Sequence, residues 1–123
     1  MKFAKYILII GLIGILYFVS TKVDSCSLLK KNTICLRVLK GEWKFKPEKI
    51  TINTGQEWTL KIYNEDNFLH SFYINELKIN ETLPPEKETT IKIKSNEPGT
   101  YTFFCSIVCG EGHYRMNGQI EVK

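Results

Sequence analysis

The strongest constraint on this chain is a run of metal-binding side chains near its C-terminus. The sequence C-x3-C-x3-H-x2-M places Cys105, Cys109, His113 and Met116 in one short segment. Thiolate and thioether sulfurs are soft donors and imidazole is borderline, so the run favours soft or borderline metals and disfavours magnesium and calcium. The other histidine, His70, lies well upstream. A fold that uses all of these donors must bring His70 to the run.

Apolar and polar residues alternate along most of the chain from residue 34 onward, with the period of two that half-buried strands show. The alternating apolar positions are Leu36 and Val38, Trp43 and Phe45, Ile50 and Ile52, Trp58, Leu60 and Ile62, Ile91 and Ile93, and Ile120 and Val122. Turn signals such as Pro84-Pro85 and Pro98-Gly99 separate these runs. The pattern predicts an all-β Greek-key sandwich of about seven or eight strands, with no helix in this part of the chain.

The same alternation places two of the donors. His70 shares one side of an expected strand with Phe72 and Ile74, so His70 should point inward. Cys105 ends another expected strand and shares a face with Phe103. The donor run would then join the last two strands, and a sandwich can bring His70 beside it.

The N-terminus carries a separate signal. Residues 6–19 are almost entirely apolar, and a helix over residues 3–21 would be about 28 Å long, just enough to cross a bilayer. Tyr6 and Tyr17 sit where interfacial aromatics belong, which favours a membrane anchor; a cleaved signal peptide and a lipoprotein signal are the alternatives. The expected parts are an N-terminal membrane anchor (1–21), a polar tether (22–33) and one β-domain (34–123).

Two further cysteines, Cys26 and Cys35, lie outside the donor run and nine positions apart. In an extracytoplasmic tether we expect a disulfide between them, whereas a lipid on Cys26 would leave Cys35 free. Cys105 and Cys109 could also form a disulfide, but that would leave the histidine and methionine of the run unexplained.

The charge of the chain argues against a nucleic-acid partner. Beyond Lys2 and Lys5 the chain has 15 basic and 13 acidic residues, a net charge of +2. Charges of both signs alternate without a block of one sign, which is typical of a solvated face. We therefore expect no nucleic-acid binding.

Part of the donor set is that of a mononuclear copper site. Cys109, His113 and Met116, together with His70, would supply one thiolate, two imidazoles and an axial thioether, the ligands of blue copper. Cys105 adds a second thiolate. Two thiolates can bridge two copper ions, with one imidazole on each ion.

Three parts of the chain carry a family resemblance: the donor run, the segment 66–70 and the sequence Trp43-x-Phe45-x-Pro47. They resemble the CuA cupredoxin domain of cytochrome c oxidase subunit II, in the short single-anchor form found in bacterial and archaeal haem-copper oxidases. The resemblance extends over about residues 36–123 and implies a cupredoxin fold that holds a binuclear copper centre.

The resemblance also implies a role for each donor. The implied ligands are Cys105 and Cys109 as bridging thiolates, His70 and His113 as terminal imidazoles, Met116 as a weak axial ligand, and the backbone carbonyl of Ile107. The common pattern of the family has glutamate at the position of Ile107, where its carboxylate binds magnesium at the interface with the catalytic subunit. Isoleucine keeps the carbonyl but cannot bind magnesium.

The function that the resemblance implies is electron transfer. The chain would be the subunit II at which electrons enter a cytochrome c oxidase, taken from a soluble donor such as cytochrome c or a small copper protein and passed to the haem-bearing catalytic subunit. It would make and break no bonds itself. The anchor would hold it in the lipid bilayer of the cell membrane, with the copper domain on the extracytoplasmic side, and Trp43, Phe68 and Tyr114 are candidates for the docking patch.

Two other functions are alternatives. The absence of the carboxylate at Ile107 favours a stand-alone membrane-tethered copper redox carrier or a copper-delivery scaffold. A metal-free extracellular binding module would require Cys105 and Cys109 to form a structural disulfide.

Overall fold

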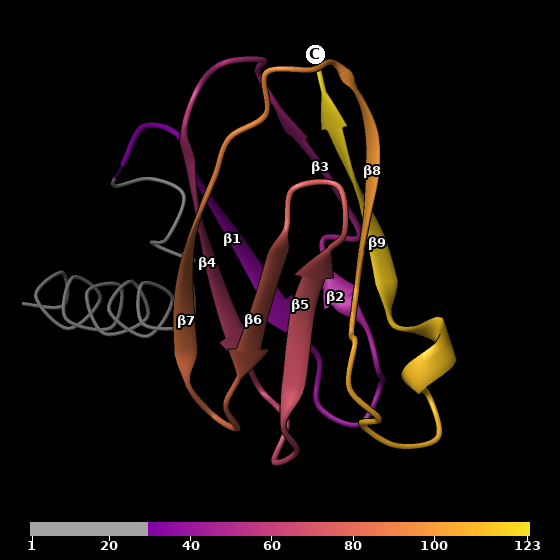
Figure 1. Cartoon of the computed structure of the whole chain (residues 1–123). Helices are drawn as coiled ribbons and strands as arrows, with labels where there is room; N and C mark the ends of the chain where they lie inside the picture. The colour runs from indigo at the N-terminus through magenta and orange to yellow at the C-terminus, as the bar shows by residue number, and fades with distance from the viewer. Residues whose placement is uncertain (1–29) are drawn as a thin grey trace, which may run out of the picture.

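The structure of the protein is a computed structural model that describes residues 30–123, shown in Figure 1. The expected anchor (1–21), Cys26 and most of the tether (22–33) lie outside these residues, so those expectations remain predictions. Between residues 30 and 123, no helix is long and apolar enough to cross a membrane.

Nine strands and one short helical turn make up the described part of the chain. They are β1 (Thr33–Val38), β2 (Phe45–Lys46), β3 (Lys49–Ile52), β4 (Trp58–Asn64), β5 (His70–Ile74), β6 (Ile79–Leu83), β7 (Glu88–Ile93), β8 (Gly99–Phe104), the 3-10 turn η1 (His113–Arg115) and β9 (Asn117–Val122).

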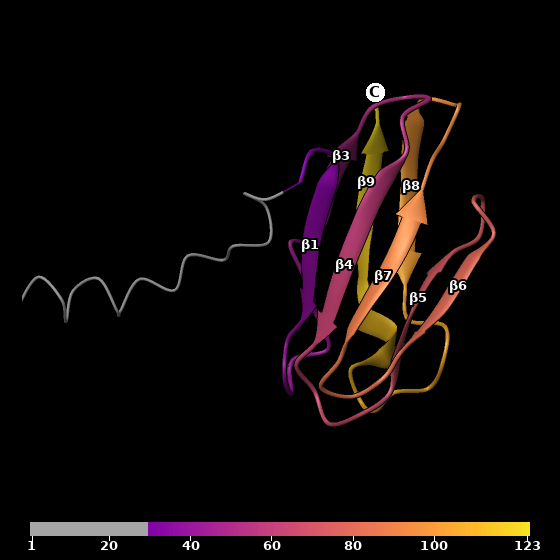
Figure 2. The ribbon, with the colours of Figure 1, turned by 90° about the vertical axis from the view of Figure 1, so that its left-hand side faces the viewer.

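The strands form the two layers of a sandwich, and in Figure 2 strands β1, β4 and β7 of one sheet lie in front of β8 and β9 of the other. One sheet has the order β2-β1-β4-β7 and the other the order β3-β9-β8-β5-β6. The pairs β1 with β4 and β3 with β9 are parallel, and the other pairs are antiparallel. The predicted all-β sandwich is confirmed, and in the described residues the apolar alternation points side chains into the space between the two sheets.

The strand that sequence reasoning missed is β6. Of its five residues only Leu83 is buried, so the sequence shows no alternation there. Pairing creates this strand instead, because it lies antiparallel to β5, with Thr82 opposite Ser71. Trp43 also differs from expectation, since it lies before β2 with a φ of 50° and is not part of a strand.

Three phenylalanines from both sheets fill the core. The ring of Phe103 in β8 lies 5.1 Å from that of Phe45 in β2 and 4.9 Å from that of Phe72 in β5, and all three side chains are almost completely buried. Phe72 is two residues from His70, and Phe103 is two residues from Cys105. Because strand residues two apart share a face, this cluster lies directly beneath the two donors.

We expect Phe103→Ala to lower the free energy of unfolding by about 3 to 5 kcal/mol, because it removes a buried ring and leaves a cavity. Thr102→Ala in the same strand, where the side chain is exposed, should change it by less than about 0.5 kcal/mol. Chemical denaturation of the two variants measures both values. Equal destabilisation by the two would contradict this account of the core.

Candidate metal centre

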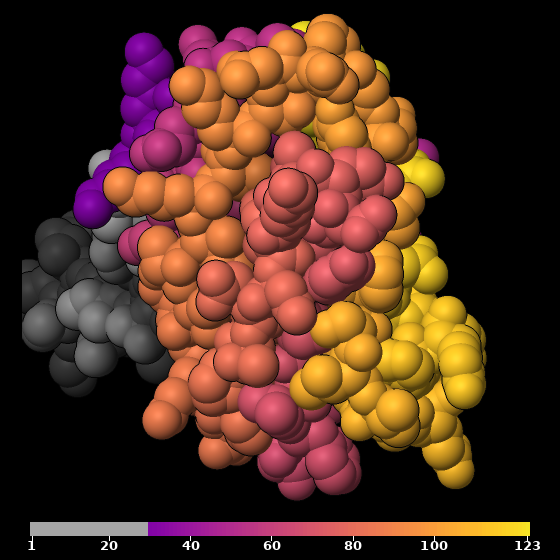
Figure 3. Space-filling view, viewed as in Figure 1, coloured from indigo at the N-terminus to yellow at the C-terminus, as the bar shows by residue number. Residues whose placement is uncertain are grey.

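The donors meet at one end of the sandwich because two strands are neighbours. β5 lies beside β8 in the second sheet, so His70 at the start of β5 is near Cys105, which directly follows β8. Residues 105–116 then cross this end of the molecule and lead into β9. In the space-filling view of Figure 3 this loop, in orange and yellow, lies against the residues that come directly before β5, in pink.

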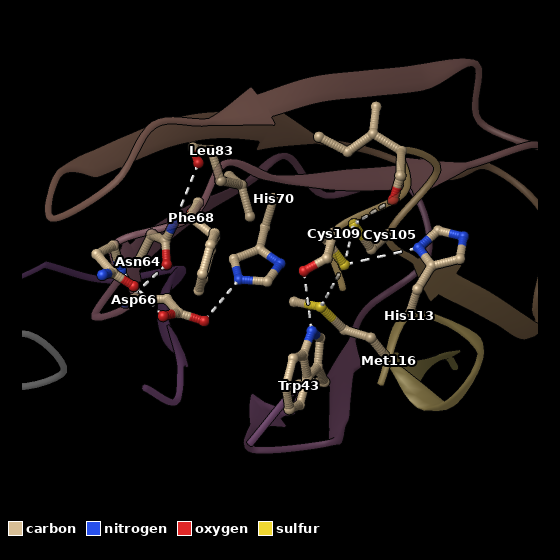
Figure 4. A network of polar contacts seen from close by, with 12 residues as sticks. Trp43, Asn64, Asp66, Phe68, His70, Leu83, Cys105, Cys109, His113 and Met116 are labelled. Atoms are coloured by element: carbon tan, nitrogen blue, oxygen red, sulfur yellow. Dashed lines mark hydrogen bonds and ion pairs between the residues drawn. The ribbon is translucent and has the colours of Figure 1, made fainter. Parts of the chain in front are cut away.

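The two ring nitrogens of His70 have different surroundings. Nε2 lies 3.0 Å from Oδ2 of Asp66, and both side chains are buried. Nδ1 is buried and has no hydrogen-bond partner. Figure 4 shows this nitrogen on the side of the ring that faces the cysteines. A histidine held by a carboxylate through one nitrogen presents the other to a metal ion.

The position of Asp66 is itself fixed by the buried Asn64 at the end of β4. The side-chain amide of Asn64 donates to the carbonyls of Phe68, at 2.8 Å, and Leu83, at 2.9 Å, while its oxygen accepts the N–H of Asp66 at 2.9 Å. Hydrogen bonds from Asn64 therefore link the residues of the loop between β4 and β5 to one another and to β6. Asp66 begins the segment 66–70 that carries the family resemblance, but the sequence alone indicates no role for Asp66 or Asn64.

Cys105 and Cys109 are buried free thiols whose sulfurs lie 3.3 Å apart. That distance is much longer than the roughly 2.05 Å of a disulfide bond. One ring nitrogen of His70 and both sulfurs lie within 4.8 Å of one another. The structure therefore brings three of the six predicted ligands into a single buried cluster, and it does not support the metal-free alternative that required a disulfide here.

The remaining predicted ligands surround Cys105 and Cys109. Nδ1 of His113 lies 3.6 Å and Sδ of Met116 lies 4.0 Å from the sulfur of Cys109. The carbonyl oxygen of Ile107 lies 3.3 Å from the sulfur of Cys105. All six predicted donors thus meet at one centre, whose His70 side is deeply buried and whose His113 side is only partly buried.

The indole ring of Trp43 packs against the donor loop and holds it in place. Its indole N–H donates to the carbonyl of Cys109 at 3.0 Å. Gly110 and Gly112 lie so close to the indole that a Cβ atom on them would be 2.8 Å and 2.3 Å from ring atoms. The loop can rest on this ring only because it has glycine at both positions. The role of Trp43 in positioning the loop was not anticipated from its sequence position.

Two serines next to the donors were also missed by the sequence analysis. Ser71 is completely buried, and its hydroxyl lies 3.8 Å from the sulfur of Cys105 and accepts the N–H of Ser106 at 2.7 Å. Alternation along β5 puts Ser71 on the side opposite His70, where a serine usually faces solvent. The sequence gave no signal for this contact, because the loop after β8 covers the strand.

The local environment separates the pKa values of the two thiols. Burial alone would raise the pKa of Cys105, but interactions with His70, Cys109 and Ser71 outweigh it and lower the value to about 6. Burial and the neighbouring Cys105 raise the pKa of Cys109 to about 12. Burial opposes a charge on His70, yet Cys105 and Asp66 raise its pKa above 6.5. Two sulfurs this close cannot both ionise easily without a cation between them.

The donor set fits copper. The site offers two thiols, two imidazoles, one thioether and one carbonyl, with no side-chain carboxylate among the predicted ligands, so hard cations are disfavoured. The buried and unpartnered Nδ1 of His70 is explained if it binds a metal. The close thiols, which in the absence of metal share a proton, are explained in the same way.

The sequence of the chain is similar to a known domain family and to two characterised proteins. The sequence matches the cupredoxin-like domain over residues 8–121. The chain belongs to the cupredoxin-like family. It is 32% identical over 92 residues to cytochrome c oxidase subunit 2 of Thermus thermophilus, which confirms the resemblance to subunit II; the match spans 75% of this chain and 67% of that protein. A second subunit 2 sequence from the same species, also 32% identical, is matched over 54% of its length.

The fold agrees with this assignment. The periplasmic domain of subunit II of cytochrome oxidase from Bradyrhizobium japonicum superposes with a TM-score of 0.65 at 15% identity, over 76% of this cupredoxin and 84% of that domain. At this identity the likeness shows the fold alone. The copper electron-transfer role expected from the sequence is supported at the level of the family, and the ligand assignment rests on the geometry given above.

We expect the thiols of the reduced, metal-free cupredoxin to titrate far apart. Cys105 should be a thiol below and a thiolate above about pH 6, while Cys109 should stay protonated until about pH 12. Thiolate absorbance in the ultraviolet, followed against pH, measures this. Cys105→Ser should remove the acidic step and Val108→Ala should not. A single step for both cysteines near pH 9 would contradict the coupling.

Proposed function

We propose that this cupredoxin holds a binuclear CuA centre and serves as the electron-accepting subunit II of a haem-copper cytochrome c oxidase. The observation that carries the proposal is the pair of free sulfurs 3.3 Å apart, with the unpartnered nitrogen of His70 near both. A mononuclear blue-copper site needs only one thiolate, so the second buried thiolate is accounted for by a second metal ion.

In this proposal each donor has a defined place. The two thiolates, Cys105 and Cys109, and the two imidazoles, His70 and His113, would hold the two copper ions. Met116 and the carbonyl of Ile107 would be the weaker ligands, which agrees with their contacts to different sulfurs, Met116 to Cys109 and Ile107 to Cys105. Copper would supply one-electron chemistry at a site that needs no acid, base or bound substrate.

The protein contributes a largely buried setting in which neighbouring residues hold the donors in place. Four of the donor residues are buried, and the packed rings of Phe45, Phe72 and Phe103 lie in the core beneath His70 and Cys105. Asp66 holds the orientation of His70, and Trp43 holds the loop. Donors that keep their positions in both redox states lower the reorganisation energy of each electron transfer.

An apolar surface next to the centre supports docking of a redox partner. Phe68 and Val108 are 56% and 89% exposed, and together with Leu69, Ile107 and Trp43 they line a hollow of about 380 Å³ above Cys109. Tyr114, 92% exposed, marks the other side of the loop beside His113. Exposed apolar residues in a cluster are typical of interaction sites. A soluble donor such as cytochrome c or a small copper protein is the proposed partner.

The proposal places the copper domain on the extracytoplasmic side of the cell membrane, held there by the predicted anchor at residues 1–21. The relatives named cytochrome c oxidase subunit 2 and the periplasmic domain from Bradyrhizobium japonicum support this location. They also support association with a haem-bearing catalytic subunit.

Copper stoichiometry and electron paramagnetic resonance test the nature of the centre. The full chain, loaded with copper and mildly reduced, should hold two copper ions that share one unpaired electron. Cys105→Ser removes one of the two thiolates and should leave one copper with a mononuclear spectrum, while Val108→Ala, in the same loop, should keep the binuclear signal. One copper per wild-type chain would overturn the binuclear assignment.

Ile107 favours a second candidate function, a stand-alone copper redox carrier or copper-delivery scaffold. The side chain at this position is apolar and only partly buried, so it offers no carboxylate for magnesium at an interface with a catalytic subunit. The two candidates differ in their partner and not in the copper site.

Isolation of the full chain from its native membrane distinguishes the two candidates. A subunit II should purify together with a haem-bearing protein in constant ratio, as read from the haem absorption spectrum. The same isolation with the anchor residues 1–21 removed should yield the copper domain without haem. If the intact chain is also isolated without haem, it is a carrier or scaffold.

A further inference from the structure

Ser71 is a buried polar residue that the ligand assignment does not use. It follows His70 in β5, is 0% exposed and lies on the face of the strand opposite the histidine side chain. Its hydroxyl oxygen lies 3.8 Å from the sulfur of Cys105 and 2.9 Å from the hydroxyl oxygen of Ser106. A buried hydroxyl beside a sulfur ligand can change the electron density on that sulfur by hydrogen bonding to it.

The hydrogen bonds of Ser71 can be counted. A serine hydroxyl has one hydrogen to donate and can accept through its oxygen. The oxygen already accepts the backbone N–H of Ser106 at 2.7 Å. The single hydrogen must therefore go to one of two acceptors, the sulfur of Cys105 or the hydroxyl oxygen of Ser106.

A hydrogen bond to the neighbouring strand β6 makes the hydroxyl oxygen of Ser106 available as one of these acceptors. Its hydroxyl donates to the side-chain oxygen of Asn80 in β6 at 3.2 Å, which leaves its oxygen free to accept. Ser106 and Asn80 are both exposed, whereas Ser71 is completely buried. A short chain of hydrogen bonds thus runs from the surface to one of the two thiols, and no comparable hydroxyl contacts the sulfur of Cys109 among the described residues.

We propose that Ser71 is a positioning residue that tunes Cys105 alone, and that Ser106 competes with the sulfur for its hydrogen. This inference rests on the proposed copper function. When Ser71 donates to the sulfur, it withdraws electron density from that thiolate and makes it a weaker donor to the oxidised metal. Hydrogen bonding to the sulfur ligand is one of the recognised controls of reduction potential in copper–thiolate sites.

The competition predicts effects of opposite sign. Ser71→Ala removes the hydrogen bond to the sulfur, strengthens the thiolate as a donor and stabilises the oxidised state, so the reduction potential should fall. Ser106→Ala removes the competing acceptor but keeps the backbone N–H that holds Ser71, so more of the hydrogen goes to the sulfur and the potential should rise. A residue that served only to pack the loop would not produce shifts in opposite directions.

The experiment is a redox titration of the copper-loaded full chain, followed by the thiolate-to-copper charge-transfer absorption. Ser71→Ala should shift the potential downward and the absorption to lower energy, and Ser106→Ala should shift both the opposite way. Ser71→Thr keeps a hydroxyl at this position. Adding Ser106→Ala to Ser71→Thr should therefore raise the reduction potential, as it does in the wild-type background. Thr82→Ala, the exposed residue opposite Ser71 in β6, is the matched control and should change neither reading.

Opposite shifts support the inference, and equal, same-signed or absent shifts overturn it. If Ser71→Ala fails to bind copper, the comparison of Ser106→Ala with Thr82→Ala decides: a higher potential in the former supports the inference, and identical potentials overturn it. Failure of the proposed function looks different, because it would appear in the wild-type chain itself, as one copper ion per chain or as no redox-active copper.

Discussion

The hydrogen bond between Asp66 and His70 determines how the centre can be assembled. It occupies Nε2 at 3.0 Å and leaves Nδ1 buried, without a partner, on the side of the cysteines. A buried imidazole that lacked this bond could turn its ring, and either nitrogen could then face the sulfurs. Asn64 fixes Asp66 in turn, so a chain of three side chains connects the end of β4 with the nitrogen that we propose as a copper ligand.

The sequence predicted the parts of the fold that follow from local pattern. Alternation over residues such as Leu60 and Ile62, or Phe72 and Ile74, is visible in a single chain because each strand buries one face against the core. The strand β6 was not visible, because it is held by pairing with β5 and buries little of its own surface. Trp43 was placed in a strand for a related reason: apolar spacing does not reveal a backbone turn with positive φ.

The candidate site shows the same division. The sequence pointed to the residues that lie together at this site because copper favours those side chains, and a run of Cys, Cys, His and Met is rare enough to stand out. The residues that hold these proposed donors in place were not predictable. Ser71, Ser106, Asn64 and the indole of Trp43 are ordinary polar or aromatic residues, and their roles arise only from contacts between segments distant in the chain.

Five of the six proposed donors come from a single loop of the chain, and only His70 is contributed by a separate strand. The loop is joined to two antiparallel strands of the same sheet, β8 and β9, which pair from Gly99 with Val122 to Phe104 with Asn117, and a backbone hydrogen bond from Cys105 to Met116 closes the loop. The scaffold and the chemistry are therefore largely modular. An exchange of residues 105–116 alone could alter the number of metal ions while the sandwich remained unchanged, which offers evolution a short route between mononuclear and binuclear members of one fold.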